Sequence, residues 1–158
     1  MQIEKSIKKK TTLCYIEKDG AYLMMHRTKK ENDINKDKWI GIGGKIEKDE
    51  NPFDCVKREI REETGVTVTG LKYRGIVTFI LEPNEIEEMH LFTADGYVGE
   101  IDYNCTEGEL KWIKKEEIGN LPIWEGDKIF FNLLEKEQGF FNLKLKYNKD
   151  KLIKYQIN

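Results

Sequence analysis

The sequence predicts an α/β fold, in which helices pack on both faces of a mixed β-sheet. Segments rich in β-branched and aromatic residues lie on both sides of an amphipathic helical segment, and a second helical segment comes late in the chain. Turn signals are spread evenly between these segments. The 158 residues, of which 39% are hydrophobic and 35% charged, therefore fit one globular domain that spans residues 1–158.

Strands are expected at intervals along the chain, each bounded by turn residues. They cover residues 11–17, 21–26, 66–68, 75–81, 89–97, 110–113, 140–147 and 152–156. Asp19-Gly20 and Asn148-Lys149-Asp150 are hairpin turns, and Glu82-Pro83-Asn84-Glu85 is a further turn. A helix is expected late in the chain over residues 125–135, because its apolar residues recur at helical spacing.

The first helix is expected from Pro52 to Thr64. Asn51 can cap its start, proline suits the first helical position, and Gly65 can adopt the left-handed backbone that ends it. At 3.6 residues per turn, its apolar side chains form one stripe that should pack on the sheet. This stripe contains Phe53, Val56 and Ile60.

Three carboxylates, Glu59, Glu62 and Glu63, crowd another side of this helix. Like charges at this spacing destabilise a helix by roughly 0.2–0.5 kcal/mol per pair, so the cluster indicates a bound cation. Hard oxygen donors suit Mg²⁺, which commonly bridges to substrate phosphates. Zinc is disfavoured, because neither His26 nor His90 has a nearby ligand partner in the sequence.

The segment from Gly44 to Val66 resembles the Nudix box, G-x5-E-x7-R-E-U-x-E-E-x-G-U, in which U is a bulky aliphatic residue. Every specified position matches. A solvated acidic helix after a glycine turn is the ordinary interpretation of such a charge run, but it does not explain why Glu50, Arg58 and Gly65 all fall in register. The resemblance implies a Nudix α/β/α sandwich with a central mixed β-sheet.

A second, looser resemblance is to the MutT-type enzymes that hydrolyse oxidised purine nucleoside triphosphates. Trp39-Ile40-Gly41-Ile42-Gly43-Gly44-Lys45 and Trp124-Glu125-Gly126-Asp127 carry it, together with residues 110–113 and the late hairpin. It implies Mg²⁺-dependent hydrolysis, with Mn²⁺ as a substitute, of substrates such as 8-oxo-dGTP to the monophosphate and pyrophosphate, for nucleotide-pool sanitation. Two departures, Ile40 for an asparagine and Gly126 for a second acid, leave the preferred base open.

The resemblance also implies the catalytic and metal-binding residues. The box carboxylates would hold Mg²⁺ and activate water, with Glu63 as the most severe single loss. The full metal set would be the Gly43 carbonyl, Glu59, Glu62, Glu63 and Glu107, with Glu109 competing for the last place. Arg58, counted with the catalytic residues, is expected to pair with an acid such as Glu50 and fix the loop against the helix; the alternative is a surface arginine.

For the base, the same resemblance assigns ring stacking to Trp124, edge reading to Asp127 and a pocket wall to Phe79. Each of these side chains could instead belong to the core, an equal alternative for Phe79. The other expected substrate-binding positions are Thr12, Ile42, Gly44, Lys45 and His26, with Arg27 beside the sugar and phosphates. For His26, an ordinary surface position at a strand end is the competing interpretation.

Composition limits the possible binding partners and indicates the cellular compartment. A net charge of −2 without a basic block disfavours nucleic-acid polymers but allows a nucleoside triphosphate. The polar first ten residues and the lack of a long apolar run indicate a cytoplasmic protein without a membrane segment, a monomer or small homo-oligomer. The three cysteines favour reduced, buried thiols.

Two alternatives to an oxidised purine triphosphate remain open. The chain could be a Nudix hydrolase for another diphosphate, such as ADP-ribose, a nucleotide sugar or a pyrimidine triphosphate. It could also be a nucleotide-binding module without turnover, although the complete carboxylate set disfavours this.

Overall fold

The computed structural model describes residues 7–29, 32–83, 85–105 and 107–158. Position 84 of the predicted 82–85 turn lies outside them. The secondary-structure elements of the chain are β1 (Ile7–Lys18), β2 (Ala21–Arg27), β3 (Trp39–Ile40), α1 (Pro52–Thr64), β4 (Thr67–Thr69), β5 (Lys72–Leu81), β6 (Glu85–Ala94), β7 (Gly96–Val98), β8 (Gly108–Lys114), the 3-10 helix η1 (Lys115–Asn120), α2 (Asp127–Glu135), β9 (Phe141–Asn148) and β10 (Lys151–Ile157).

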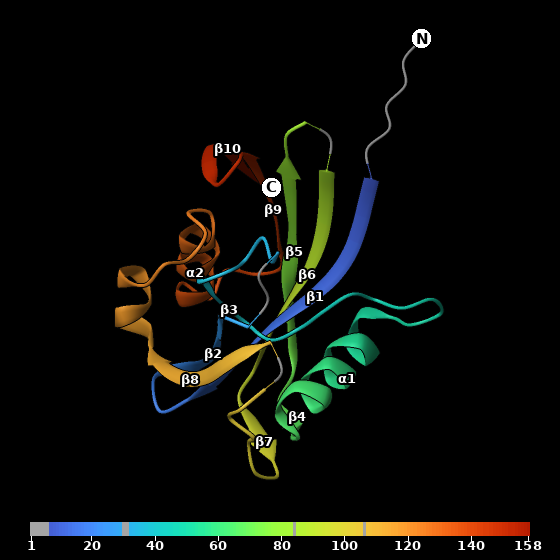
Figure 1. Cartoon of the computed structure of the whole chain (residues 1–158), viewed down its shortest axis with the longest axis vertical. Helices are drawn as coiled ribbons and strands as arrows, with labels where there is room; N and C mark the ends of the chain where they lie inside the picture. The colour runs from blue at the N-terminus through green and yellow to red at the C-terminus, as the bar shows by residue number, and fades with distance from the viewer. Residues whose placement is uncertain (1–6, 30–31, 84, 106) are drawn as a thin grey trace.

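The main sheet is mixed, as predicted. Its strand order is β10-β9-β5-β6-β1-β2-β3, and β8 pairs with β2. The pairs β1–β6 and β5–β9 are parallel, whereas the other neighbours are antiparallel. The short strands β4 and β7 form a separate sheet beside α1 (Figure 1).

The two α-helices lie on opposite sides of the main sheet (Figure 1). Successive strand residues point to opposite faces, so β1 serves both packing layers. Cys14 belongs to the buried cluster that contains Val56 and Ile60 of α1. Tyr15 belongs to the cluster that contains Phe130 of α2. The predicted α/β/α arrangement is therefore confirmed.

Helix α1 has the predicted bounds. The Asn51 side chain accepts a hydrogen bond of 2.9 Å from a backbone N–H of the first turn, and Gly65 ends the helix with φ of 84°. In the predicted apolar stripe, Phe53 is 40% exposed but packs edge-on against Phe92 of β6, with ring centroids 5.1 Å apart, and Cys55 is fully buried. Cys55 therefore completes the buried side of the helix.

Some predicted boundaries were wrong. The strand expected over residues 89–97 splits at Asp95, since β7 leaves the main sheet to pair with β4. Asp95-Gly96 at this bend is the same dipeptide as the turn Asp19-Gly20, so the local sequence contains a signal for the break, which the expected strand ran across. Helix α2 begins at Asp127 rather than residue 125, and the short β3 and η1 were not predicted.

The predicted thiols are confirmed, since all three cysteines are free and buried. In the part of the chain that the structure describes, every helix is too short or too polar to cross a membrane.

Candidate active site

The glycine-rich segment 41–46 runs along β1 and fixes one edge of the site. The Thr12 backbone N–H donates to the Gly44 carbonyl at 2.8 Å, and the Cys14 N–H donates to the Ile42 carbonyl at 2.7 Å. A side chain at Gly43 would place its Cβ 2.0 Å from the Thr12 carbonyl oxygen. This close backbone approach therefore requires glycine.

The next glycine brings the same segment against α1. A Cβ on Gly44 would lie 2.4 Å from the carboxyl carbon of Glu59. The absent side chain thus leaves the room that the Glu59 carboxylate occupies, directly against the loop. The glycine and the glutamate of the motif are spatial neighbours as well as sequence markers.

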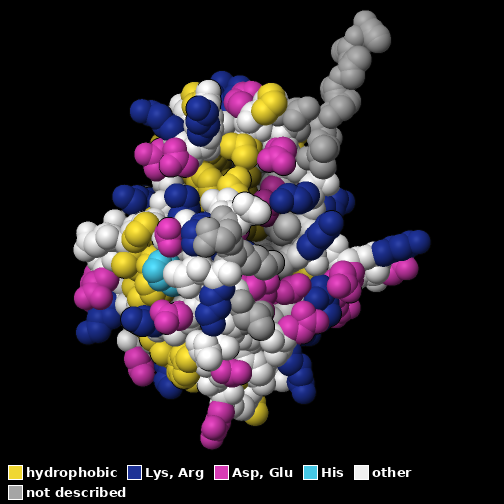
Figure 2. All heavy atoms as spheres, in the orientation of Figure 1, with side chains coloured by type: hydrophobic (Ala, Val, Ile, Leu, Met, Phe, Trp, Pro, Cys, Tyr) yellow, Lys and Arg dark blue, Asp and Glu magenta, His cyan; other side chains and the backbone are white. Residues whose placement is uncertain are grey.

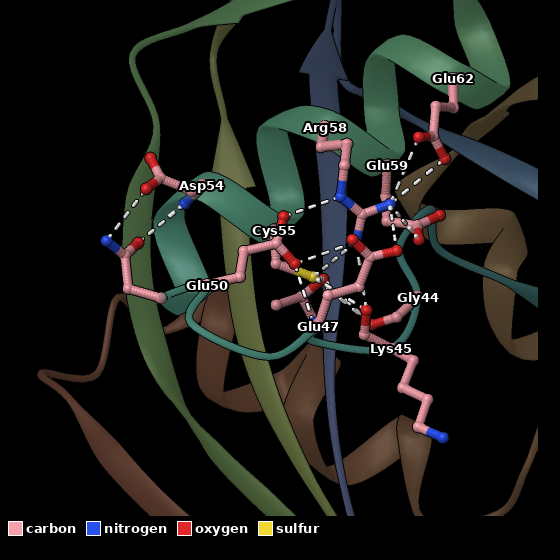
Figure 3. A network of polar contacts seen from close by, with 11 residues as sticks. Gly44, Lys45, Glu47, Glu50, Asp54, Cys55, Arg58, Glu59 and Glu62 are labelled. Carbon is pink, nitrogen blue, oxygen red and sulfur yellow. Dashed lines mark hydrogen bonds and ion pairs between the residues drawn. The ribbon is translucent and has the colours of Figure 1, made fainter.

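Arg58 connects this loop with the acidic side of α1 (Figure 3). Its Nε and Nη2 donate to the two carboxylate oxygens of Glu50 at 2.7 and 3.0 Å, which confirms the predicted pair. Its Nη1 donates to Glu59 at 3.0 Å and to Glu62 at 3.3 Å, and Nη2 reaches the Lys45 carbonyl at 3.2 Å. The Arg58 hydrogen bonds lower the pKa of Glu50 to about 2. Arg58 therefore contacts two of the expected metal ligands as well as the loop.

Glu63 lies on the more buried side of the cluster. Burial, a hydrogen bond to Glu59 and the nearby Glu107 carboxylate raise the pKa of Glu63 well above that of a free carboxyl group, and Arg27 opposes them. Arg27 Nη1 lies 3.1 Å from Glu107. Glu107 thus lies beside the box carboxylates, whereas the competing candidate Glu109 projects to solvent from β8.

The oxygen-rich donor set of this cluster fits Mg²⁺ in chemistry. Among the described residues, no three acidic, histidine or cysteine side chains converge on one point, because the Glu59 and Glu62 carboxylates accept hydrogen bonds from Arg58. The crowding that keeps a proton on Glu63 is the condition that a divalent cation relieves. Metal binding would therefore exchange the Arg58 contacts of these carboxylates for metal contacts.

A cavity of about 260 Å³ opens on the other side of the glycine segment. Its lining includes the predicted residues Thr12, Gly43, Gly44, Phe79, Trp124 and Asp127, and also Arg27 and Ile40. Figure 2 shows hydrophobic side chains gathered in a hollow of this face, with charged side chains around it. The glycine segment is thus a shared wall, with the cavity on one side and Glu59 on the other.

Trp124 is held in place by three neighbours. Its Nε1 donates to the Asn35 side-chain oxygen at 2.7 Å, and the Lys38 ammonium lies 4.8 Å from its ring centroid. The ring of Tyr147 meets it edge-on, with centroids 5.1 Å apart. A ring fixed in this way offers a ready surface for a flat ligand.

Asp127 is a buried acid in the cavity wall. It is 3% exposed, and its carboxyl group has no hydrogen-bond partner within the described ranges. Burial raises the pKa of Asp127 well above its usual value, against the opposing charge of Lys38. The neutral carboxyl group can therefore both donate and accept a hydrogen bond inside the cavity.

Comparison with known proteins decides the family. Residues 8–134 match the model of the NUDIX domain. This chain belongs to the Nudix family. It is 30% identical, over an alignment of 154 positions, to an uncharacterized Nudix hydrolase, YvcI, of Bacillus subtilis, and the alignment covers 94% of this chain and 94% of that protein. It is 27% identical to the oxidized purine nucleoside triphosphate hydrolase of Danio rerio, over 82% of this chain and 83% of that protein.

Solved structures agree with this assignment. A MutT protein from Bacillus halodurans has a TM-score of 0.83 and 27% identity, covering 95% of this chain and 97% of its own. A MutT protein from Methanosarcina mazei has a TM-score of 0.73 and 26% identity, covering 86% of this chain and 98% of its own. Nudix hydrolases act on nucleotide substrates and generally use a divalent metal such as Mg²⁺.

Three predicted substrate-binding residues of this Nudix hydrolase lie outside the cavity lining. Ile42 is fully buried in the cluster beneath α1. The Lys45 side chain is exposed and points away from the Arg58 network (Figure 3). His26 stacks on Trp39, with ring centroids 4.5 Å apart. The geometry gives these side chains no place in the cavity wall.

The cavity is also lined by residues that were not predicted from the sequence, chiefly Tyr147, Asn35 and Ile34. In β9 the buried residues alternate, so Tyr147 could be placed on the inner face of a strand. Its contact with Trp124 depends on the packing of α2 against the sheet, which the strand pattern does not contain. The two others come from the segment between β2 and β3, for which no element was predicted.

Proposed function

We propose that this Nudix hydrolase converts purine nucleoside triphosphates, including oxidised ones such as 8-oxo-dGTP, to the monophosphate and pyrophosphate with Mg²⁺. The observation that carries the proposal is the shared wall: Gly43 and Gly44 line the cavity, and Gly44 also touches Glu59. A nucleotide with its base in the cavity would thus extend its phosphates toward the carboxylates. The Danio rerio relative, described as an oxidized purine nucleoside triphosphate hydrolase, supports the substrate class.

The cavity suits a flat base with polar edges. Phe79 and the fixed Trp124 supply aromatic faces, and Asp127 supplies a buried polar group in a wall that is apolar for the larger part. A few placed polar groups among apolar ones are typical of sites that orient a small ligand. The two departures from the MutT pattern, Ile40 and Gly126, lie in or beside this wall and bear on the choice of base.

Residues of α1, together with Glu107 just before β8, would perform the hydrolysis. Glu59, Glu62, Glu63, Glu107 and the Gly43 carbonyl would hold Mg²⁺, and when bound it would supply positive charge against the phosphates and lower the pKa of water. Glu63 takes a proton from the attacking water, whose oxygen forms a bond to phosphorus as the bridging P–O bond breaks. The products of this cleavage are the nucleoside monophosphate and pyrophosphate. Arg58 positions Glu50 and the loop throughout.

The test is steady-state hydrolysis with Mg²⁺ of 8-oxo-dGTP, 2-hydroxy-dATP, dGTP, dCTP and ADP-ribose, with products identified. The proposal expects the highest kcat/KM for purine triphosphates and release of pyrophosphate. A preference for ADP-ribose or dCTP would overturn the substrate class and leave the Nudix chemistry standing. Binding of nucleotides without any Mg²⁺-dependent product would instead indicate a binding module.

A further inference from the structure

Tyr147 lines the cavity, and its hydroxyl group lies at the start of α2, close to Asp127. Its side chain is 1% exposed at the end of β9, and it lines the cavity. Its Oη accepts a hydrogen bond of 2.7 Å from the backbone N–H of Gly126. The hydroxyl is therefore held at a fixed position at the start of α2.

The glycine at 126 is what makes room for this hydroxyl. A Cβ at that position would lie 2.6 Å from Leu145 Cδ1 and 2.8 Å from the Tyr147 Oη. A larger residue there would have to displace both side chains. In this chain Tyr147 and Gly126 are thus a matched pair.

The hydroxyl has an unused donor. A phenol has one O–H donor, and the Gly126 N–H already occupies an acceptor position on its oxygen. For the proton of Tyr147, the residues that the structure describes supply no acceptor. Burial and the nearby Asp127 and Glu125 carboxyl groups raise the pKa of Tyr147, so this proton is retained at any physiological pH. A ligand in the cavity would meet a donor at this point.

We propose that the Tyr147 hydroxyl selects the base, by donating its proton to an exocyclic oxo group on the base edge. The proposal rests on the proposed function, because it needs a nucleotide base in the cavity. Exocyclic groups project furthest from the ring and reach the wall first. An oxo oxygen accepts the Tyr147 proton, whereas an amino group brings a second donor against it and leaves both unsatisfied. The favoured substrates are then oxopurine nucleotides, and 6-aminopurine nucleotides are disfavoured.

The test compares dIMP with dAMP, whose bases carry an oxo and an amino group at the same ring position. Dissociation constants are measured by titration calorimetry without metal, so that turnover plays no part. The wild-type protein should bind dIMP about tenfold more tightly than dAMP, from the energy of one buried hydrogen bond and the cost of an unmade one. Tyr147→Phe should weaken dIMP binding about three- to tenfold, whereas dAMP binding should be retained or become tighter, because the opposed donor is gone.

Tyr22→Phe is the matched control, since it removes the phenol hydroxyl of another buried residue, one outside the cavity lining. It should keep the wild-type dIMP-to-dAMP ratio. Equal binding of the two nucleotides by the wild type, or an equal loss for both in Tyr147→Phe, would overturn the role of Tyr147. If 8-oxo-dGTP is still hydrolysed in either case, the proposed function survives alone. If the wild type binds neither monophosphate and hydrolyses no purine triphosphate, both proposals fail.

Discussion

The acidic side of α1 and the cavity on the far side of the glycine segment are built in opposite ways. The first region is a short continuous stretch of chain, in which one guanidinium group bonds to three carboxylates. The second is assembled from β1, β5, β9 and the start of α2, and the Asp127 carboxyl and Tyr147 proton have no partner in the described chain. Paired charges can exchange partners for a metal, whereas unpaired buried groups can distinguish ligands. Substitutions should therefore separate turnover from base recognition.

The largest effect is expected for Glu63→Gln. If Glu63 receives the proton of the attacking water, this change should lower kcat by about 10²–10⁴-fold and leave nucleotide binding nearly intact. The measurement is kcat for 8-oxo-dGTP with Mg²⁺, with calorimetric binding of the same nucleotide. Glu116→Gln, which removes an exposed acid from η1, is the matched control and should match the wild type. A loss of only a few-fold in folded Glu63→Gln would remove Glu63 from the centre of the mechanism.

The next effect is expected in the other region. Trp124→Ala should raise KM for purine triphosphates about 10–100-fold, since stacking of a base on an aromatic ring contributes about 1–3 kcal/mol. Trp124→Phe should restore most of this affinity, because phenylalanine keeps an aromatic face. The separation of the two regions would be broken if Trp124→Ala lowered kcat as strongly as Glu63→Gln while KM stayed unchanged.

A smaller effect, on stability, is expected for Arg58→Ala. The change removes a two-pronged ion pair and leaves Glu50, whose side chain is 14% exposed, without its counter-charge. Allowing for screening by solvent, the free energy of unfolding should fall by about 1–2 kcal/mol. Urea denaturation measures it, with the exposed Arg61→Ala of the same helix as control. Equal losses in the two variants would show that the Arg58 network adds little to stability.

The smallest effect is a pH dependence. The pKa of Glu50 is about 2 in the folded protein against an ordinary 4.5, so the ion pair stabilises the fold above about pH 4.5. That stabilisation is lost as the pH falls from 4.5 toward 2. Glu50→Gln should be less stable than the wild type at neutral pH, with a difference that shrinks over this range in acid denaturation. A constant difference between pH 6 and about 2 would contradict the lowered pKa.

The same contrast explains what the sequence could predict. The caps and bounds of α1, the Arg58–Glu50 pair and the carboxylate side depend on residues that are close in the chain, where helical spacing fixes which side chains meet. These features are local, and local rules are sufficient for them. The mixed sheet was expected from the order of strands and helices and from the Nudix resemblance, since pairings such as β1 with β6 join distant segments.

The cavity is different, because its walls meet only after the sheet has formed. Whether Phe79 packs in the core or faces a cavity is decided by the register of β5 with β9, and Tyr147 reaches Trp124 through the packing of α2. Ile42 was expected in the wall, but alternation along the glycine segment turns it toward α1. Strand patterns give the face of a sheet and not the neighbours across it.

The most direct test of a single site with two regions is a crystal structure of Glu63→Gln with 8-oxo-dGTP and Mg²⁺. The account predicts that the base lies in the cavity between Phe79 and Trp124, with the phosphates passing Gly43 and Gly44 toward Mg²⁺ on the Glu59 side. A base bound outside the cavity, or phosphates directed away from α1, would contradict the account.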